Sequence, residues 1–211
     1  MKYLDKHHVS YDPSKTHMIL HKEHQKLHGN VAIISDLTLK MRQYDKLVKL
    51  SVMLKNWLKS YQREFDLNPI DIGLEAIENK KQELMKDAKS MITDDLEKVK
   101  HIKGLGIRYL AGILAYAHPS RFASLRKFLH YCGHKQSSKV TNRYSRKICS
   151  LTRQIAISLI RQKNPIYYPL YLKIKGDLSK RNPNLRKVVI HEMALNRTGT
   201  FLLKEIYQIF H

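Results

Sequence analysis

Apolar side chains recur every seven residues between residues 37 and 65. One register holds Leu37, Tyr44, Ser51, Leu58 and Phe65, and the complementary register holds Leu47, Leu54 and Tyr61. A heptad repeat puts both registers on one face of an α-helix, which would be on the order of 40 Å long at 1.5 Å per residue. Asn68 and Pro69 interrupt the pattern, because proline cannot continue a helix. The repeat therefore predicts a long amphipathic helix that ends before this turn.

A second repeat follows the Asn-Pro turn. Its two registers are Ile70, Ile77, Leu84 and Met91, and Leu74, Lys81 and Ala88. Two helices of matched length joined by a short turn form an antiparallel hairpin. We therefore expect residues 37–98 to form a long, coiled-coil-like hairpin whose seams pack on each other or on a second copy of the chain. This hairpin is also where we expect the protein to form a homodimer or a higher oligomer.

Two groups of side chains are of the types that bind metal ions. The first group is His17, His21, His24 and His28, which share one face if their segment is helical. One helix presents only two histidines to an ion, however, whereas zinc usually takes four converging ligands. The acidic residues between 75 and 97 alternate with lysines at helical pair spacings, which is typical of a solvated helix. We predict no metal site in either group, and we interpret residues 1–36 as a polar, His-rich segment.

After residue 98 the predicted helices become shorter. Ser124 can cap one of them, and a longer helix opens within Thr141–Lys147. Gly176-Asp177 predicts a helix break, and a final helix is expected to begin near Thr198-Gly199. No stretch alternates β-branched and polar residues around hairpin turns, so we predict an all-α fold. Its segments are residues 1–36, 37–98 and 99–211.

A glycine-rich turn opens the last segment. Gly104-Leu105-Gly106 stands between a charged helical run and an apolar one that contains Ala111, which is the pattern of a helix-hairpin-helix. Glycine permits a sharp turn at positive φ and leaves the amides of Gly104, Gly106 and Ile107 bare where the dipole of the second helix favours an anion. We expect that anion to be a phosphate group. The alternative is a tight corner between two helices that binds nothing.

The overall charge favours a polyanionic partner. The chain has 39 Lys and Arg against 18 Asp and Glu, a formal net charge of +21, and its pI is near 9.9. No acidic residue lies between Lys98 and Asp177. Clustered cations supply non-specific affinity for nucleic acid, and DNA is the first candidate partner. The predicted nucleic-acid-binding residues are Lys103, Gly104, Gly106, Ile107, Arg108, Lys135, Lys139, Arg143, Arg146, Lys147 and Arg153.

Tyr167, Tyr168 and Tyr171 lie close to further cations. Aromatic side chains among cations are typical of surfaces that bind single-stranded nucleic acid. Tyrosines at one- and three-residue spacing on a helix also pack in protein cores. Both interpretations stay open at the level of the sequence.

Membrane and disulfide-rich classes are not expected. No apolar run approaches the ~20 residues needed to span a bilayer, and no apolar signal-peptide core follows Met1. We therefore expect a soluble, cytoplasmic protein with no membrane partner. Cys132 and Cys149 form no C-x-x-C pair, so we predict neither a disulfide framework nor a zinc ribbon, and no cofactor.

The order of these pieces resembles a known family. After the predicted hairpin come the Ile-Lys-Gly-Leu-Gly-Ile run at 102–107, the Phe-Leu-His-Tyr-Cys-Gly run at 128–133, Ser137-Ser138, and the basic segment at 141–147. This order is similar to the C-terminal part of insertion-sequence transposases of the IS one-ten, IS one-sixteen and IS nine-zero-two group, relatives of the Piv-type DNA invertases. The resemblance covers about residues 40 to 210.

The resemblance implies a role in DNA recombination or transposition at a prokaryotic nucleoid. It also implies a catalytic serine in the loop after Gly133, and Ser138 or Ser137 occupies that place. The family's ribonuclease-H-like domain, whose acidic residues bind metal ions, has no counterpart in this sequence. We therefore expect a truncated or split family member, and Mg²⁺ only if a partner supplies the acidic site.

Two hypotheses about function follow. In the first, the protein is a transposase-like DNA-binding protein with a serine nucleophile. In the second, it is a non-catalytic module that holds the backbone of DNA or of a structured RNA, such as the guide RNA that full-length relatives are thought to use.

Overall fold

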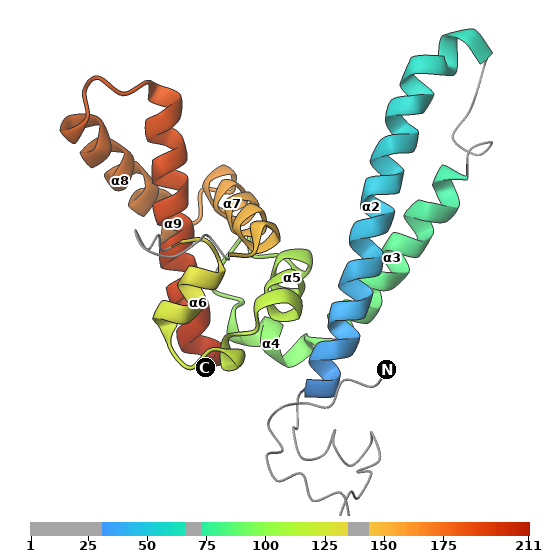
Figure 1. The fold of residues 1–211 in the computed structure, drawn as a ribbon, viewed down its shortest axis with the longest axis horizontal. Coiled ribbons are helices and arrows are strands. Elements are labelled where there is room, and N and C mark those ends of the chain that lie inside the picture. Colours follow the sequence, from blue (N-terminus) through green and yellow to red (C-terminus); the bar gives the residue numbers. More distant parts are fainter. Residues whose placement is uncertain (1–30, 66–72, 135–143) are drawn as a thin grey trace, which may run out of the picture. The chain divides into compact units, whose positions relative to one another are not determined.

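The structure is a computed structural model that describes residues 31–65, 73–134 and 144–211. Within these ranges the regular structure is helical, with eight α-helices and one short 3-10 helix (Figure 1). The elements are α2 (Val31–Phe65), α3 (Leu74–Met91), α4 (Thr93–Lys98), α5 (Ile107–Ala117), η2 (Pro119–Arg121), α6 (Leu125–Tyr131), α7 (Arg146–Arg161), α8 (Tyr167–Arg181) and α9 (Lys187–Phe210). No strand occurs in the described ranges, and for them the prediction of an all-α fold is confirmed.

Serine side chains cap two of these helices. The Ser124 hydroxyl accepts a hydrogen bond from the amide of Lys127 at 3.3 Å, so Ser124 caps α6 as predicted. The Ser145 hydroxyl accepts one from the amide of Ile148, also at 3.3 Å. Each of these bonds satisfies a backbone donor that the first turn of a helix leaves without a partner. Helix α7 consequently begins at Arg146, inside the predicted segment.

Polar contacts connect α2 with α3. Lys40 forms an ion pair with Asp87, and the buried hydroxyl of Ser51 donates to Oε1 of Glu78 at 2.6 Å. Hydrogen bonds from Lys81 and Ser51 lower the pKa of Glu78 to about 2. Early residues of α2 thus meet late residues of α3, as in antiparallel neighbours. The prediction of two helices of matched length is wrong, because α2 has 35 residues and α3 has 18 and ends at Met91, before the separate helix α4. The coiled-coil-like hairpin over 37–98 otherwise stays a prediction, because the connection at 66–72 lies outside the described residues.

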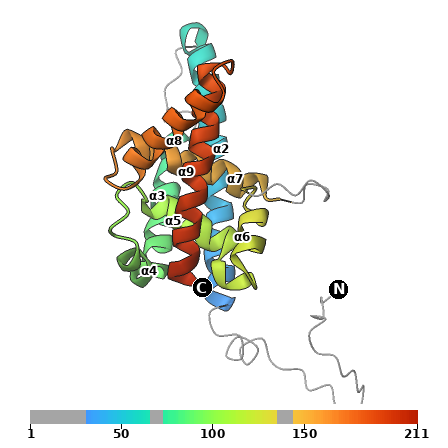
Figure 2. The ribbon, with the colours of Figure 1, turned by 90° about the vertical axis from the view of Figure 1, so that its left-hand side faces the viewer.

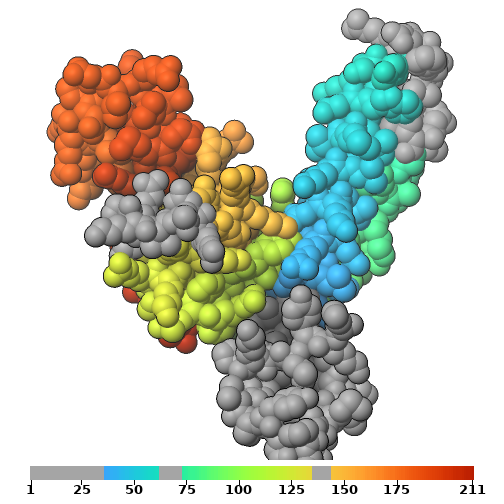
Figure 3. Space-filling model, viewed as in Figure 1, coloured from blue at the N-terminus to red at the C-terminus, as the bar shows by residue number. Residues whose placement is uncertain are grey.

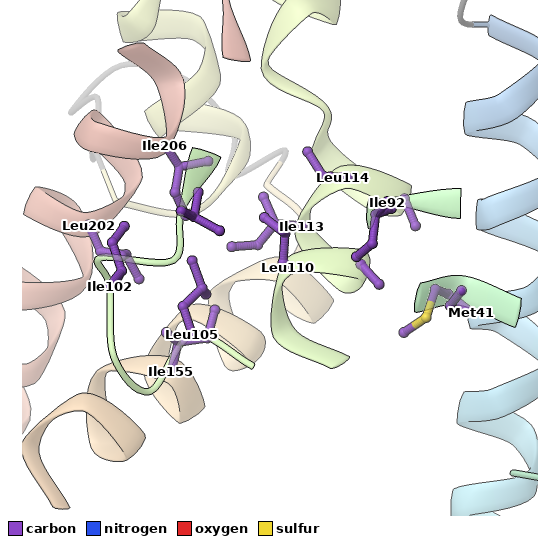
Figure 4. Packing of buried hydrophobic residues seen from close by; sticks show 14 of the residues in the cluster. Met41, Ile92, Ile102, Leu105, Leu110, Ile113, Leu114, Ile155, Leu202 and Ile206 are labelled. Atoms are coloured by element: carbon purple, nitrogen blue, oxygen red, sulfur yellow. The ribbon is translucent and has the colours of Figure 1, made fainter. Parts of the chain in front are cut away.

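One hydrophobic cluster joins residues of α2, α3, α5, α7 and α9 (Figure 4). Helix α2 contributes Leu37 and Met41, and α3 contributes Ala88. Ile102 and Leu105, which lie at the glycine turn, are only 2% and 6% exposed. Burying each such side chain contributes about 1.5–3 kcal/mol, so the turn is fixed in place by its own apolar residues. Further members are Leu110, Ile113, Leu114, Ile155, Leu202 and Ile206.

Two of the three tyrosines of α8 are buried, in a helix that lies side by side with α9 in both views (Figures 1 and 2). Tyr167 and Tyr171 are 1% and 5% exposed. The Tyr171 hydroxyl lies 2.6 Å from Nδ1 of His191 on α9. Of the two interpretations left open by the sequence, the structure therefore favours a core role for Tyr167 and Tyr171.

Two predicted helix boundaries are wrong. Helix α8 continues through Gly176 without a break, and α9 begins at Lys187, well before Thr198 and Gly199. An exposed glycine costs a helix only about 1 kcal/mol, which the buried face of α8 outweighs. In α9 the Thr198 hydroxyl donates to the carbonyl of Ala194 at 2.9 Å. Gly199 is buried there at a close approach between α9 and α7, so it serves packing and does not begin the helix.

Replacing Gly199 with alanine should destabilise the protein by about 1–3 kcal/mol. The new Cβ would lie 2.9 Å from Cγ2 of Thr152 and 3.1 Å from Cε1 of His134. This crowding outweighs the gain in helix propensity of about 1 kcal/mol. Urea unfolding followed by circular dichroism measures the effect.

The matched control is Gly176→Ala, because a Cβ at this exposed mid-helix glycine meets nothing within 4 Å. We expect it to stabilise the protein by about 0.5–1 kcal/mol. If Gly199→Ala were as stable as Gly176→Ala, the close packing of α9 on α7 would be contradicted.

Candidate nucleic-acid interface

The glycine turn joins the end of α4 to the start of α5. Gly104 has φ +102°, and the amide of Leu105 donates to the carbonyl of Ile102 at 3.0 Å to close the turn. Gly106 has φ −73° and ψ 169° and is the residue that precedes the first turn of α5. The expectation of a positive φ is therefore correct for Gly104 and wrong for Gly106. Gly106 is instead in extended conformation, which any residue can adopt.

A buried amide side chain holds the turn. Asn164 is fully buried, and its Nδ2 donates to the carbonyl of Lys103 at 2.8 Å. Its Oδ1 accepts hydrogen bonds from two backbone amides at the start of α8, at 2.9 and 3.0 Å. Ser158 of α7 also donates to the carbonyl of Gly104, at 3.2 Å. The turn is thus attached to α7 and to the first turn of α8 by hydrogen bonds.

A carboxylate of α9 provides a third attachment. Glu205 lies 2.7 Å from Nε2 of His101 through one oxygen and accepts a hydrogen bond from the Tyr167 hydroxyl through the other. Burial and this carboxylate raise the pKa of Tyr167 above its usual value, so the phenol stays protonated and donates. Three helices that follow the turn in the sequence therefore position it.

An open depression of about 470 Å³ lies at the turn. Its lining includes Lys100, Lys103, Gly104, Gly106, Ser158 and Gln162. Among the described residues no hydrogen bond is found for the amides of Gly104 and Gly106. The amide of Ile107 belongs to the first turn of α5, whose donors have no partner within the helix. The amides predicted from the sequence therefore lie beside a depression lined by Lys100 and Lys103 and by one acid, Glu97, which is ion-paired with Lys100.

A second, smaller depression of about 170 Å³ lies where α2, α5 and α7 meet. Arg108 is part of its lining, and its guanidinium carbon lies 5.8 Å from the ring centroid of Tyr44 and 5.9 Å from that of Tyr109. These cation–π contacts hold the arginine without neutralising it. In the described part of the chain neither Lys103 nor Arg108 forms an ion pair, and both are exposed.

Two of the predicted cations are paired with acids. Lys147 forms an ion pair with Asp45 of α2. Arg153 makes a bidentate contact with Glu192 of α9, at 2.8 and 2.5 Å, which lowers the pKa of Glu192. The stretch between Lys98 and Asp177 contains no acid, but acids from α2 and α9 reach its cations. Arg153 is therefore a weaker candidate for phosphate binding than the sequence indicates.

The remaining predicted residues lie, in sequence, between the end of α6 and the first turn of α7. Arg146 is exposed in the first turn of α7. The amide of Ser145 donates to the carbonyl of Tyr131 at 2.8 Å, which brings the start of α7 close to the end of α6. The residues that lie outside the described part of the chain are Lys135, Ser137, Ser138, Lys139 and Arg143.

Four contacts of the site were missed by the sequence analysis, those of Asp45, Ser158, Asn164 and Glu205. Asn164 precedes Pro165 at the start of a helix, so its capping role has a sequence signal. Its contact with Lys103 has no such signal, because the two residues are 61 positions apart. The same holds for Asp45 and Glu205, whose partners lie on distant elements.

Nothing in the described residues brings three or more His, Cys, Asp or Glu side chains together as a metal site would. Cys132 and Cys149 are both free, and burial raises the pKa of the Cys132 thiol to about 12. No helix within the described ranges is long and apolar enough to cross a membrane.

No protein-family model, curated protein or solved structure matches the chain. The described residues define an all-helical protein with a cationic glycine turn. Its relation to transposases remains a resemblance that rests on the sequence order given above.

Replacing Asn164 with alanine should destabilise the protein by about 2–4 kcal/mol, because the carbonyl of Lys103 and two amides at the start of α8 lose their partner. Urea unfolding measures this loss. The control is Asn184→Ala, at an exposed position between α8 and α9, which should change the free energy of unfolding by less than about 0.5 kcal/mol. Equal effects of the two substitutions would show that Asn164 does not hold the turn.

Proposed function

We propose that this protein binds the sugar–phosphate backbone of DNA through the glycine turn and the first turn of α5, in the manner of a helix-hairpin-helix. One observation carries the proposal. The bare amides of Gly104 and Gly106 and the uncompensated charges of Lys103 and Arg108 all lie at the same end of α5.

The chemistry of this end of α5 suits a phosphate. Backbone amides at a helix N-terminus donate hydrogen bonds to phosphate oxygens, and the helix dipole favours negative charge there. Lys103 and Arg108 add positive charge, and neither forms an ion pair among the described residues. A tight corner without a ligand would not require exposed cations on either side of the glycines. The formal net charge of +21 supports the same class of partner.

The wider role that we propose is that of a transposase-like protein in DNA recombination. The order of the glycine turn, the Phe-rich segment and the basic helix supports it by resemblance alone. Residues 37–98 would then supply the contact between copies of the chain. A backbone-binding module for structured RNA is the alternative, because phosphate contacts do not distinguish DNA from RNA.

Charge reversal at the turn should weaken DNA binding. We expect Lys103→Glu with Arg108→Glu to lower the affinity for a duplex at least about tenfold at about 150 mM salt, because each lost phosphate contact costs affinity. The slope of log affinity against log salt should become shallower by about 0.9 for each lost contact. Fluorescence anisotropy with a labelled duplex measures both quantities.

The matched control reverses two exposed cations of α8, with Lys173→Glu and Lys180→Glu. The net charge changes equally, so a non-specific effect of charge would appear in both variants. If the α8 variant weakened binding as much as the α5 variant, binding would be diffuse and the proposed site would be wrong.

A serine-nucleophile reaction is the second candidate function. The contact between Ser145 and Tyr131 brings the two ends of the serine-bearing segment together, next to the exposed Arg146. In this reaction the Oγ of Ser138 or Ser137 attacks a backbone phosphorus, an Oγ–P bond forms, and the P–O bond to one strand breaks. The serine proton passes to the departing sugar oxygen. Acidic residues that hold Mg²⁺ would come from another polypeptide.

The reaction predicts a covalent protein–DNA adduct that resists denaturing electrophoresis. Ser137→Ala combined with Ser138→Ala should abolish the adduct and leave DNA binding unchanged. Ser179→Ala, at an exposed position in α8, is the control and should retain the adduct. Tight binding without an adduct, in the presence of Mg²⁺ or Mn²⁺ and of the polypeptide that supplies the acidic residues, would contradict the reaction and leave the non-catalytic module.

A further inference from the structure

One acidic side chain, that of Asp45, lines the smaller depression between α2, α5 and α7. Besides Asp45, the polar lining of this depression consists of Arg108, Tyr116, Lys147, Ser150 and Gln154. All of these side chains except Asp45 can donate hydrogen bonds. The depression is therefore an anion-binding arrangement whose present anion is the carboxylate of Asp45.

The contacts of Asp45 converge on one oxygen. Tyr116 of α5 donates its hydroxyl to Oδ2 at 2.8 Å, and Nζ of Lys147 pairs with the same oxygen. The ammonium group of Lys147 also lies 3.5 Å from the centroid of the Tyr116 ring. A phosphate oxygen at this position would receive the same two contacts, because it is also an anionic acceptor.

The two depressions share one face of α7. Lys147, Ser150, Gln154, Ser158 and Gln162 follow one another at spacings of three and four residues, which places them along a single side of the helix. The first three line the second depression, and the last two line the depression at the glycine turn. Figure 3 shows the surface of α7 in yellow-orange beside the blue surface of α2. A nucleic-acid strand that contacts the glycine turn could therefore continue along α7 toward Lys147.

We propose that the depression between α2, α5 and α7 is a second backbone-phosphate site, and that Asp45 occupies it until a phosphodiester displaces the carboxylate. This inference rests on the proposed nucleic-acid function and adds a regulation to it. The ion pair can be displaced at low cost, because the side chains of Lys147 and Asp45 are 45% and 29% exposed and such pairs contribute little to stability in water. Asp45 then limits affinity by competing with the ligand.

The test is Asp45→Asn in the full chain, titrated with a fluorescein-labelled duplex. Removing one negative charge a few ångströms from a bound phosphate should tighten binding about five- to tenfold. Asp36→Asn is the control, because Asp36 is an exposed acid of the same helix and the change in net charge is identical. We expect it to tighten binding less than about twofold. Equal effects of the two substitutions, or weaker binding by Asp45→Asn, would overturn the proposal.

A second measurement uses the unaltered protein and does not depend on the folding of a variant. Lysine acetylation is followed by mass spectrometry with and without a saturating duplex. Lys147 should be protected by the duplex, and Lys173 of α8 should not be. Equal modification of Lys147 in the free and the bound protein would overturn the proposal.

The inference and the proposed function fail in different ways. If the unaltered protein shows no salt-dependent binding, the proposed function itself is wrong. If the unaltered protein binds, and the change at Lys103 and Arg108 weakens binding while Asp45→Asn behaves as Asp36→Asn does, only the second phosphate site is wrong.

Discussion

The buried amide of Asn164 is the interaction on which the candidate site depends. It connects the carbonyl of Lys103 with the first amides of α8, and it does so from a position with no exposed surface. A buried amide that lost these partners would cost about 1–3 kcal/mol for each unsatisfied group, so the turn and the helix start are energetically coupled. Together with Ser158 and Glu205, Asn164 fixes the glycine turn, so the conformation of the turn is set by contacts with α7, α9 and the start of α8.

Ion pairs between residues that are far apart in the sequence determine which cations of this protein stay unpaired. The stretch between Lys98 and Asp177 reads as uniformly basic, yet Asp45 and Glu192 reach into it from α2 and α9. At the turn Lys100 is paired with Glu97, whereas Lys103 and Arg108 form no ion pair with a described acid. The candidate site therefore contains fewer unpaired cations than the number of basic residues in this stretch of sequence suggests. For Lys147, the acid that neutralises it is also the group that a ligand phosphate would replace.

Local signals in the sequence were sufficient for much of the fold. The heptad repeats, the serine cap of α6 and the absence of strand patterns each concern neighbouring residues, and the described structure agrees with them. Glycines were misleading in α8 and α9, because a sequence does not tell whether a glycine breaks a helix or lets two helices approach. Gly176 neither breaks α8 nor lies at a close contact, whereas Gly199 lets α9 approach α7 closely. The glycine turn was found from its pattern, whereas Asn164 and Asp45 were missed because their partners lie on other elements.

The most direct test of the account is a titration of the unaltered protein with a short duplex, a four-way junction and a single strand at several salt concentrations. The account predicts tight binding whose log affinity falls steeply with log salt, since several phosphates are neutralised at once. A preference among the three ligands would then identify the target. Weak binding to all three, with no dependence on salt, would contradict the claim that the glycine turn holds a nucleic-acid backbone.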